Sequence, residues 1–251
     1  MKIVLLGTNG YHPTDQRDTM CVLLPESGVM FDAGTGVHRA AEYLRGDRLD
    51  IYLSHAHLDH VIGLTYFIDI QYQHSLTELT VRGEPEKLAA IRKHLFSSFL
   101  FPSVPPPMDF EALDSSGEET LLDGGLLTSF PLQHKGGSLG YRVDWPTQGK
   151  SIAYVTDTTA SPDADYIESI RGVNLLIHEC YFSDKYADLA IEKGHSSTTA
   201  VASLARQANV GALILVHFNP LADTNDPVGL EAAQRIFPNT ALGEDGMELD
   251  L

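Results

Sequence analysis

The chain has 251 residues, a length that suits one large domain or two small ones. Its 43% hydrophobic and 20% charged residues are ordinary for a globular protein and argue against disordered and fibrous classes. The formal net charge of −17 disfavours a large polyanionic partner, because nucleic-acid binders usually present clustered Lys and Arg.

Cysteine usage and hydropathy indicate a cytoplasmic protein with no membrane segment. Cys21 and Cys180 lie far apart without CxxC spacing, which predicts two buried free thiols rather than a disulfide framework or a thiolate zinc site. The first apolar run, 3–6, is too short for the core of a signal peptide. No apolar stretch approaches the roughly 20 residues that cross a bilayer.

Short strands rich in Val, Ile and Leu alternate with helical segments, and no repeat or linker divides the chain. The first clear helix begins with Pro85 as its first residue. Its apolar stripe at helical spacing consists of Leu88, Ile91, Leu95 and Phe99. The segment 101–107, FPSVPPP, cannot be helical, and with the acidic, Ser- and Gly-containing run after it predicts an irregular loop. We interpret it as a surface connection, with an active-site rim as the alternative.

Two more helices follow towards the C-terminus. One begins after His195-Ser196-Ser197, and its apolar stripe comprises Val201, Leu204, Ala205 and Ala208. Ser196 and Ser197 are interpreted as caps of this helix, with phosphate binding as the alternative. The last helix opens at 226–227 and ends before Pro238.

Five apolar, strand-like runs end on a potential metal ligand. They are 50–53 before His55 and His57, 126–132 before His134, 151–155 before Asp157, 173–177 before His178 and Glu179, and 212–216 before His217. If these strands lie side by side, their ends deliver the polar side chains to one edge. Rigid scaffolds commonly present active sites in this way.

The stretch 54–60, SHAHLDH, holds the densest group of ligands. His55 and His57 alternate around Ala56 and can face one ion, whereas Asp59 and His60 follow where a helix begins and can reach a second. A dinuclear hydrolytic site needs imidazoles, carboxylates and a shared anion between two cations about 3.5–4 Å apart.

His134 would complete the first ion's site, His217 the second, and Asp157 would bridge them. Nitrogen and oxygen ligands without thiolate suit zinc, manganese or iron(II). One histidine at a strand end is usually structural, but this combination favours metal. Four other histidines lack such a context and are interpreted as surface or supporting residues: His12, His38, His74 and His94.

On these residues the chain resembles the metallo-β-lactamase-fold hydrolases. The shared stretches are SHAHLDH (54–60), His134 before GYRV (140–143), YVTDT (154–158), LVHF (215–218), LGTNG (6–10), FDAG (31–34) and DGMEL (245–249). The resemblance implies an α/β (α+β) fold, a four-layer αββα sandwich of two similar halves with two divalent metals at one edge, zinc foremost. It also implies that residues 1–251 form a single domain.

Within that superfamily, IHECYF (177–182) and GHSS (194–197) resemble the HEAT and HST motifs of ribonuclease Z and of smaller phosphodiesterase-like proteins. The resemblance implies that His195 contacts the scissile phosphate and protonates the leaving oxygen, while Glu179 orients it. Asp59 would hold the nucleophile in line as well as bind metal. His178, which alternates with Glu179 along the strand, is expected to be a buried support.

One departure from ribonuclease Z bears on the substrate. The tRNA-processing enzymes carry a flexible arm inserted between the counterparts of Tyr154 and His178, where this chain has room for about one strand and one helix. With the acidic charge, this favours a small or cyclic phosphodiester, cleaved by metal-activated hydroxide, over RNA.

Other functions remain as alternatives. The next is ribonuclease Z-type cleavage of RNA, and after it a lactonase, β-lactamase or thioesterase that uses the same ligands for acyl transfer. The Glu179/His195 pair argues against acyl transfer, which does not require it. A redox di-iron protein is disfavoured because His57 stands where such relatives usually have an acidic residue. A non-catalytic metal-binding module comes last, because no ligand is missing. Relatives often form dimers, so a homodimer is an alternative to a monomer.

Overall fold

The computed structural model describes residues 1–97, 99–113, 118–222 and 224–251. The chain divides into two compact units, and each contains one seven-stranded sheet. The first unit comprises Met1–Gly117, Leu121–Asp123 and Glu244–Asp250, and the second comprises Glu118–Thr120, Gly124–Gly243 and Leu251. Within the described ranges no helix is long and apolar enough to cross a membrane. That residues 1–251 fold as one domain stays a prediction.

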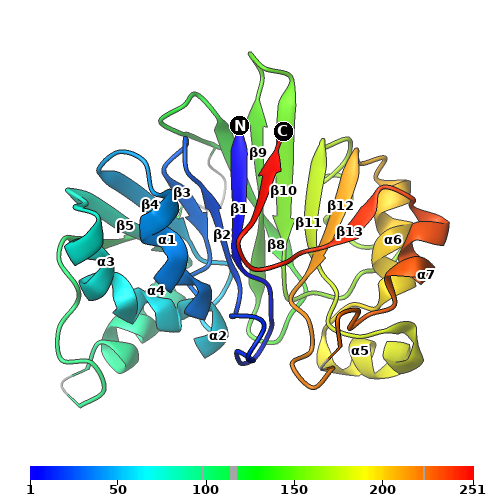
Figure 1. Ribbon diagram of the computed structural model, residues 1–251, viewed down its shortest axis with the longest axis horizontal. Coiled ribbons are helices and arrows are strands. Elements are labelled where there is room, and N and C mark those ends of the chain that lie inside the picture. The colour runs from blue at the N-terminus through cyan, green and yellow to red at the C-terminus, as the bar shows by residue number, and fades with distance from the viewer. Residues whose placement is uncertain (98, 114–117, 223) are drawn as a thin grey trace. The chain divides into compact units, whose positions relative to one another are not determined.

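The sheet of the first unit has the strand order β14-β1-β2-β3-β4-β5-β6 (Figure 1). Its strands are β1 (Lys2–Gly7), β2 (Cys21–Leu24), β3 (Val29–Phe31), β4 (Arg48–Tyr52), β5 (Glu78–Gly83), β6 (Met108–Ala112) and β14 (Met247–Asp250). Strands β3 to β6 pair in parallel, whereas β14, β1, β2 and β3 pair antiparallel. Because β3 and β4 run in parallel, the residues that follow them emerge at the same edge.

Short helices accompany this sheet (Figure 1). They are η1 (Thr35–Arg39), α1 (Ala40–Tyr43), α2 (Leu58–Val61), η2 (Ile62–Tyr66), α3 (Phe67–Gln73), α4 (Pro85–Ala90) and the π-helical turn η3 (Ile91–Leu95). Their apolar residues join those of β1, β2, β4 and β5 in one buried cluster, so the helices are held by packing on the sheet.

The helix predicted from Pro85 begins there, and its stripe residues Leu88 and Ile91 are buried. The predicted continuation to Phe99 is wrong. The backbone leaves the helical region at Phe96, with φ −87° and ψ 55°. Phe99 lies beyond this break and is 96% exposed, so its spacing from Leu95 was not that of a helix face.

The Pro-rich segment 101–107 contains no helix or strand, as predicted. The irregular loop does not extend as far as expected, because strand β6 (Met108–Ala112) follows at once and pairs in parallel with β5. Pairing with a neighbouring strand overrode the acidic, turn-like composition of this stretch. The end of the predicted loop, 114–117, lies outside the described residues.

The sheet of the second unit has the order β13-β12-β11-β10-β9-β8-β7 (Figure 1). Its strands are β7 (Glu118–Thr120), β8 (Leu126–Leu132), β9 (Ser138–Trp145), β10 (Lys150–Val155), β11 (Leu175–Glu179), β12 (Ala212–Val216) and β13 (Thr240–Leu242). Strands β10 to β13 pair in parallel. Strand β9 pairs antiparallel with both β8 and β10, so β8 runs in the direction of β10.

Four of the five ligand-bearing runs therefore end at one edge of one sheet: β8, β10, β11 and β12. The fifth run, β4, does not lie beside them, because it belongs to the other sheet. The local sequence shows that each strand ends near a potential ligand. Which strands share a sheet depends on pairing between distant segments, so a local pattern does not reveal it.

The helices of the second unit are η4 (Asp184–Tyr186), α5 (Ala187–Lys193), α6 (Thr198–Gln207) and α7 (Leu230–Ile236). Helix α6 begins directly after Ser197, as predicted, and its stripe is buried. The predicted capping by serine side chains is wrong, because Ser197 makes no capping bond. Instead Asp184 Oδ1 accepts from Thr199 N at 2.9 Å and satisfies a backbone donor of the first turn.

The last helix begins later than predicted. Asp226 Oδ1 accepts from the backbone N–H groups of Gly229, at 2.7 Å, and Leu230, at 3.0 Å. Gly229 is left-handed, with φ 79°, so the residues after Asp226 form a turn that leads into α7 at Leu230. The aspartate correctly marks the start of the segment but stands four residues before the helix itself.

Candidate metal centre

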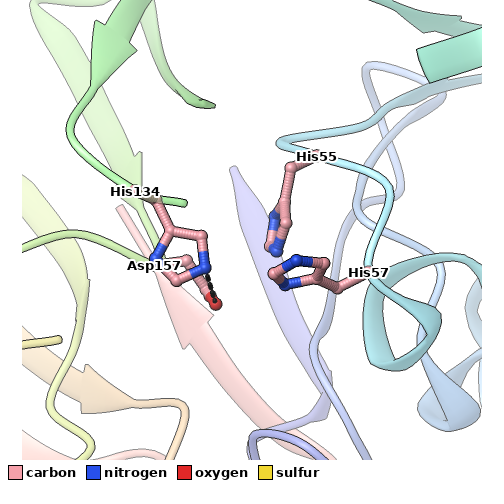
Figure 2. Close-up of side chains that lie close together, drawn as sticks. All are labelled: His55, His57, His134 and Asp157. Carbon is pink, nitrogen blue, oxygen red and sulfur yellow. Dashed lines mark ion pairs between the residues drawn. The ribbon is translucent and has the colours of Figure 1, made fainter. Parts of the chain in front are cut away.

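The first unit brings four predicted ligands together after β4. His57 is the N-cap of α2, which places Asp59 and His60 on its first turn, as expected from the sequence. The ring centroid of His55 lies 4.5 Å from that of His57 and 4.3 Å from that of His60. Figure 2 shows the His55 and His57 rings. His60 Nε2 lies 3.4 Å from Asp59 Oδ2, so imidazoles and a carboxylate converge within this unit.

Asp32, directly after β3, supports this group through hydrogen bonds. Its buried carboxylate accepts from Ser54 N at 2.7 Å and from Ser54 Oγ at 2.8 and 2.9 Å. Asp32 Oδ2 also lies 2.8 Å from His60 Nδ1. An ionised carboxylate only accepts hydrogen bonds, so Nδ1 carries the proton and the lone pair of Nε2 is left for a metal.

A second link orients His55. Ser54 Oγ donates to Asp32 and lies 3.0 Å from His55 Nδ1, so the hydroxyl oxygen accepts from the Nδ1–H of His55. The nitrogen left with a lone pair is then Nε2. Asp32 thus sets the tautomer of His60 directly and that of His55 through Ser54, as ligand-supporting carboxylates commonly do.

Two residues of the first unit that hydrogen-bond to this group are strained. Tyr11 and Asp32 adopt positive φ angles of 60° and 56°. Such conformations are uncommon outside glycine and cluster at functional sites. The backbone N–H of Tyr11 donates to Asp59 Oδ2 at 2.7 Å.

The second unit brings three predicted ligands together. Asp157 follows β10, and its two carboxylate oxygens face different histidines. Oδ1 lies 3.1 Å from His217 Nε2, and Oδ2 lies 3.5 Å from His134 Nε2, the pair joined by the dashed line in Figure 2. His217 and Asp157 are buried. One oxygen towards each histidine is the arrangement that a carboxylate shared by two cations requires.

The orientation of His134 has a backbone cause. Its Nδ1 lies 3.1 Å from the carbonyl oxygen of Gly194, which can only accept, so Nδ1 is protonated and Nε2 faces Asp157. Gly194 is the left-handed C-cap of α5, with φ 76°. The end of one helix therefore fixes the tautomer of a candidate ligand.

Glu179 and His195 form the predicted pair. His195 Nδ1 lies 3.0 Å from Glu179 Oε1, and the Glu179 side chain is fully buried at the end of β11. The same carboxylate accepts from the backbone N–H groups of Thr158, Tyr181 and Ser196 at 3.0 to 3.2 Å. These donors hold the carboxylate in place, so it gives His195 a fixed acceptor.

His195 also lies beside the candidate ligands of its own unit. One ligand atom each from Asp157, His195 and His217 lie within 4.8 Å of one another. The ring centroids of His195 and His134 are 5.3 Å apart. The predicted proton donor and the predicted ligands of the second unit thus form one group.

His178 is a buried support, as expected. Its Nδ1 lies 2.7 Å from the backbone carbonyl of Glu179, so Nδ1 donates, and its Nε2 accepts from Tyr166 Oη at 2.9 Å. Burial lowers the pKa of His178 below its usual value. The imidazole therefore remains neutral and holds the end of β11 in place.

The donor sets of both units fit divalent metal ions. Each offers imidazole nitrogens with assigned lone pairs together with a carboxylate, the ligand types that zinc takes in catalytic sites. Both cysteines, Cys21 and Cys180, are buried free thiols, as predicted, and neither joins the ligand groups found in the described residues.

The supporting roles of Asp32 and Ser196 were not identified from the sequence. Asp32 carries the same signal as the ligands, a polar residue directly after an apolar strand, and β3 pairs in parallel with β4. Ser196 supports the loop after Asp157: its Oγ donates to Thr158 O at 2.7 Å and accepts from Ala160 N at 2.8 Å. The proximity of Ser196 to that loop had no local signal.

Comparison with known proteins finds a family model and curated relatives that match most or all of this chain. A family model described as a beta-lactamase superfamily domain matches residues 28–218. A ribonuclease Z from Archaeoglobus fulgidus is 27% identical over 304 aligned positions, which cover 100% of this chain and 97% of the relative.

Two solved structures share the fold over nearly the whole chain. The metallo-beta-lactamase fold protein YhfI from Bacillus subtilis has a TM-score of 0.81 at 17% identity and covers 99% of each chain. The short form of human tRNase Z has a TM-score of 0.76 at 23% identity, covering 100% of this chain and 99% of that one. These structures confirm the predicted fold class. The two seven-stranded sheets with their helices are the elements of which this fold is built. The chain belongs to the β-lactamase superfamily and is a hydrolase with the α/β metallo-β-lactamase fold.

Proposed function

We propose that this hydrolase is a metal-dependent phosphodiesterase that acts on small or cyclic phosphodiesters. The observation that carries the proposal is the Glu179/His195 pair beside the candidate ligands Asp157 and His217. Phosphodiester cleavage expels an alcohol, whose oxygen needs a proton, and an oriented imidazole beside the reacting centre is suited to supply it.

We assign seven residues to two divalent metal ions: His55, His57, Asp59, His60, His134, Asp157 and His217. The Asp157 carboxylate, with one oxygen towards His134 and the other towards His217, supports a bridging role. When bound, the two cations supply Lewis-acid activation of a water nucleophile near neutral pH and charge for the phosphoryl oxygens. Zinc fits this donor set best, and manganese or iron(II) would suit it too.

Within this proposal the protein's own groups orient and transfer protons. Glu179 holds His195 Nδ1 at 3.0 Å, which leaves Nε2 to carry a proton towards the departing oxygen. Asp59, held by the backbone of Tyr11 at 2.7 Å, orients the nucleophile. Both carboxylates act from fixed positions, so little reorganisation is needed at the moment of reaction.

Three observations favour a small diester over RNA. The segment between β10 and β11, residues 156–174, contains only turns, bends and irregular backbone, so no arm extends from this place. The alignment with the Archaeoglobus fulgidus ribonuclease Z has 304 positions against 251 residues here, so about 50 positions of the relative have no counterpart. The net charge of −17 also disfavours a polyanion.

Cleavage of RNA is the second candidate function. It is favoured by the ribonuclease Z relatives, which match this chain along its whole length. An acyl hydrolase, such as a lactonase or thioesterase, and a non-catalytic metal-binding module rank lower, because neither accounts for the Glu179/His195 pair. A cytoplasmic location and a homodimer stay predictions.

The test compares substrates on the metal-loaded protein. We expect turnover of a 2′,3′-cyclic nucleotide to exceed that of a lactone and a thioester, and precursor tRNA to be cut slowly. His195→Ala should keep the metal content while lowering kcat for the cyclic nucleotide by about 10²–10⁴, the usual contribution of a general acid. His38→Ala, an exposed histidine in the other unit, is the control. Efficient 3′ cleavage of precursor tRNA without diester turnover would replace this proposal with the second candidate.

A further inference from the structure

An aromatic ring lies flat against the proposed proton donor. The ring centroids of Tyr181 and His195 are 4.6 Å apart and their planes differ by 17°. The Tyr181 ring also lies 5.6 Å from that of His217, at 43°. The His195 side chain is only 14% exposed. Tyr181 therefore covers one face of the imidazole.

The same carboxylate anchors both partners of this stack. Glu179 Oε2 accepts from the backbone N–H of Tyr181 at 3.1 Å, while Oε1 faces His195 Nδ1 at 3.0 Å. Glu179 is fully buried and ends β11, so it offers a rigid reference for the two rings. The backbone of His195 is fixed as well, because its N–H donates to Ala190 O at 2.9 Å.

The hydrogen bond alone leaves one motion of the imidazole open. A hydrogen bond tolerates some tilting of its donor, so small coupled changes of the two His195 side-chain torsions keep Nδ1 within reach of Glu179 while they move Nε2 along an arc. A parallel ring at 4.6 Å removes that freedom, because tilting His195 would drive it into the face of Tyr181 or break the contact. The bond and the stack together determine where Nε2 points.

We propose that Tyr181 is a positioning residue that sets the ring plane of His195 and thereby aims Nε2 at the leaving-group oxygen. This inference rests on the proposed function. In the step concerned, water oxygen bonds to phosphorus, the P–O bond to the alcohol breaks, and the Nε2 proton goes to the departing oxygen. Water also supplies, through solvent, the proton that restores His195. The HEAT motif has Thr where this chain has Tyr181, so the stack is a feature of this chain.

Two substrates with different leaving groups distinguish a misplaced His195 ring from a general loss of activity. A 2′,3′-cyclic nucleotide expels an alkoxide that needs a proton, whereas bis(p-nitrophenyl) phosphate expels a stable phenolate that does not. We expect Tyr181→Thr to lower kcat for the cyclic nucleotide at least tenfold with KM nearly unchanged, and to alter turnover of bis(p-nitrophenyl) phosphate less than about twofold. Tyr181→Phe keeps the ring and should retain both activities. Tyr186→Thr, at a 46% exposed tyrosine, is the matched control.

Two further measurements make every outcome decisive. Metal content should be unchanged in Tyr181→Thr, and the NMR signals of the His195 ring protons should move downfield as the aromatic ring above them is lost. His195→Ala is assayed in parallel. If His195→Ala shows no dependence on the leaving group, the proposed acid is wrong. If His195→Ala does depend on the leaving group, the result for Tyr181→Thr decides the positioning role. That role is refuted if Tyr181→Thr slows both substrates equally or slows neither of them.

Discussion

Replacement of Asp32 tests whether a residue that binds no metal in our assignment controls metal affinity. Its buried carboxylate accepts from Ser54 N and Ser54 Oγ and from His60 Nδ1, all between 2.7 and 2.9 Å. Asp32→Asn is the mildest perturbation, because asparagine also tolerates the positive φ of 56°. It exchanges one acceptor oxygen for an NH2 group while preserving shape.

The expected loss follows from the donors that Asp32 satisfies. In either orientation of the new amide, its NH2 group faces the Nδ1–H of His60 or the backbone N–H of Ser54. A buried donor left without an acceptor costs about 1–3 kcal/mol of stability. Where His60 is the donor affected, its proton moves to Nε2 and that nitrogen can no longer ligate. Loss of such a supporting carboxylate lowers metal affinity about 10–100-fold.

The measurements keep stability and metal binding apart. Urea unfolding of the chelator-treated protein gives stability, and competition with a chromogenic chelator gives zinc affinity. Asp50→Asn is the matched control, because this buried aspartate of the same unit pairs with Arg48 and Arg82, at 2.9 and 3.0 Å, instead of with a ligand. It should lose stability and keep its affinity. Wild-type zinc affinity in Asp32→Asn would refute the reasoning.

Three further outcomes follow from single contacts. Gly194→Ala should weaken zinc binding, because φ at this position is 76° and a Cβ would lie 3.4 Å from His134 Nδ1. Zinc titration by calorimetry measures the affinity, and an unchanged affinity would contradict this expectation. Asp184→Ala should lower the free energy of unfolding by about 1 kcal/mol, because it removes the acceptor of Thr199 N, and an unchanged urea midpoint would argue against capping. Burial raises the pKa of the Cys180 thiol, so the native protein should react with Ellman's reagent only as it unfolds, whereas rapid labelling would show that the thiol is accessible.

Local patterns were sufficient to predict the strands that end near candidate ligands and the helix after Ser197. A strand that ends on His134, Asp157 or His217 is visible in the sequence because hydrophobic runs and the polar residues after them are neighbours in the chain. Where pairing between distant segments decided the outcome, prediction failed. Strand β6 formed in a stretch read as a loop because β5 offers it a partner.

The sequence by itself determined which side chains have the chemistry for the metal ligands and the proton donor that we propose, because that chemistry belongs to the side chain. Only the tertiary structure decided how these groups are oriented. The supporting role of Asp32 depends on the parallel pairing of β3 with β4, and the orientation of His134 on the carbonyl at the end of α5. Tyr181 acquires its role by stacking on a residue 14 positions away in the chain. Hydrogen bonds and ring contacts act over a few ångströms, so they exist only after the chain has folded.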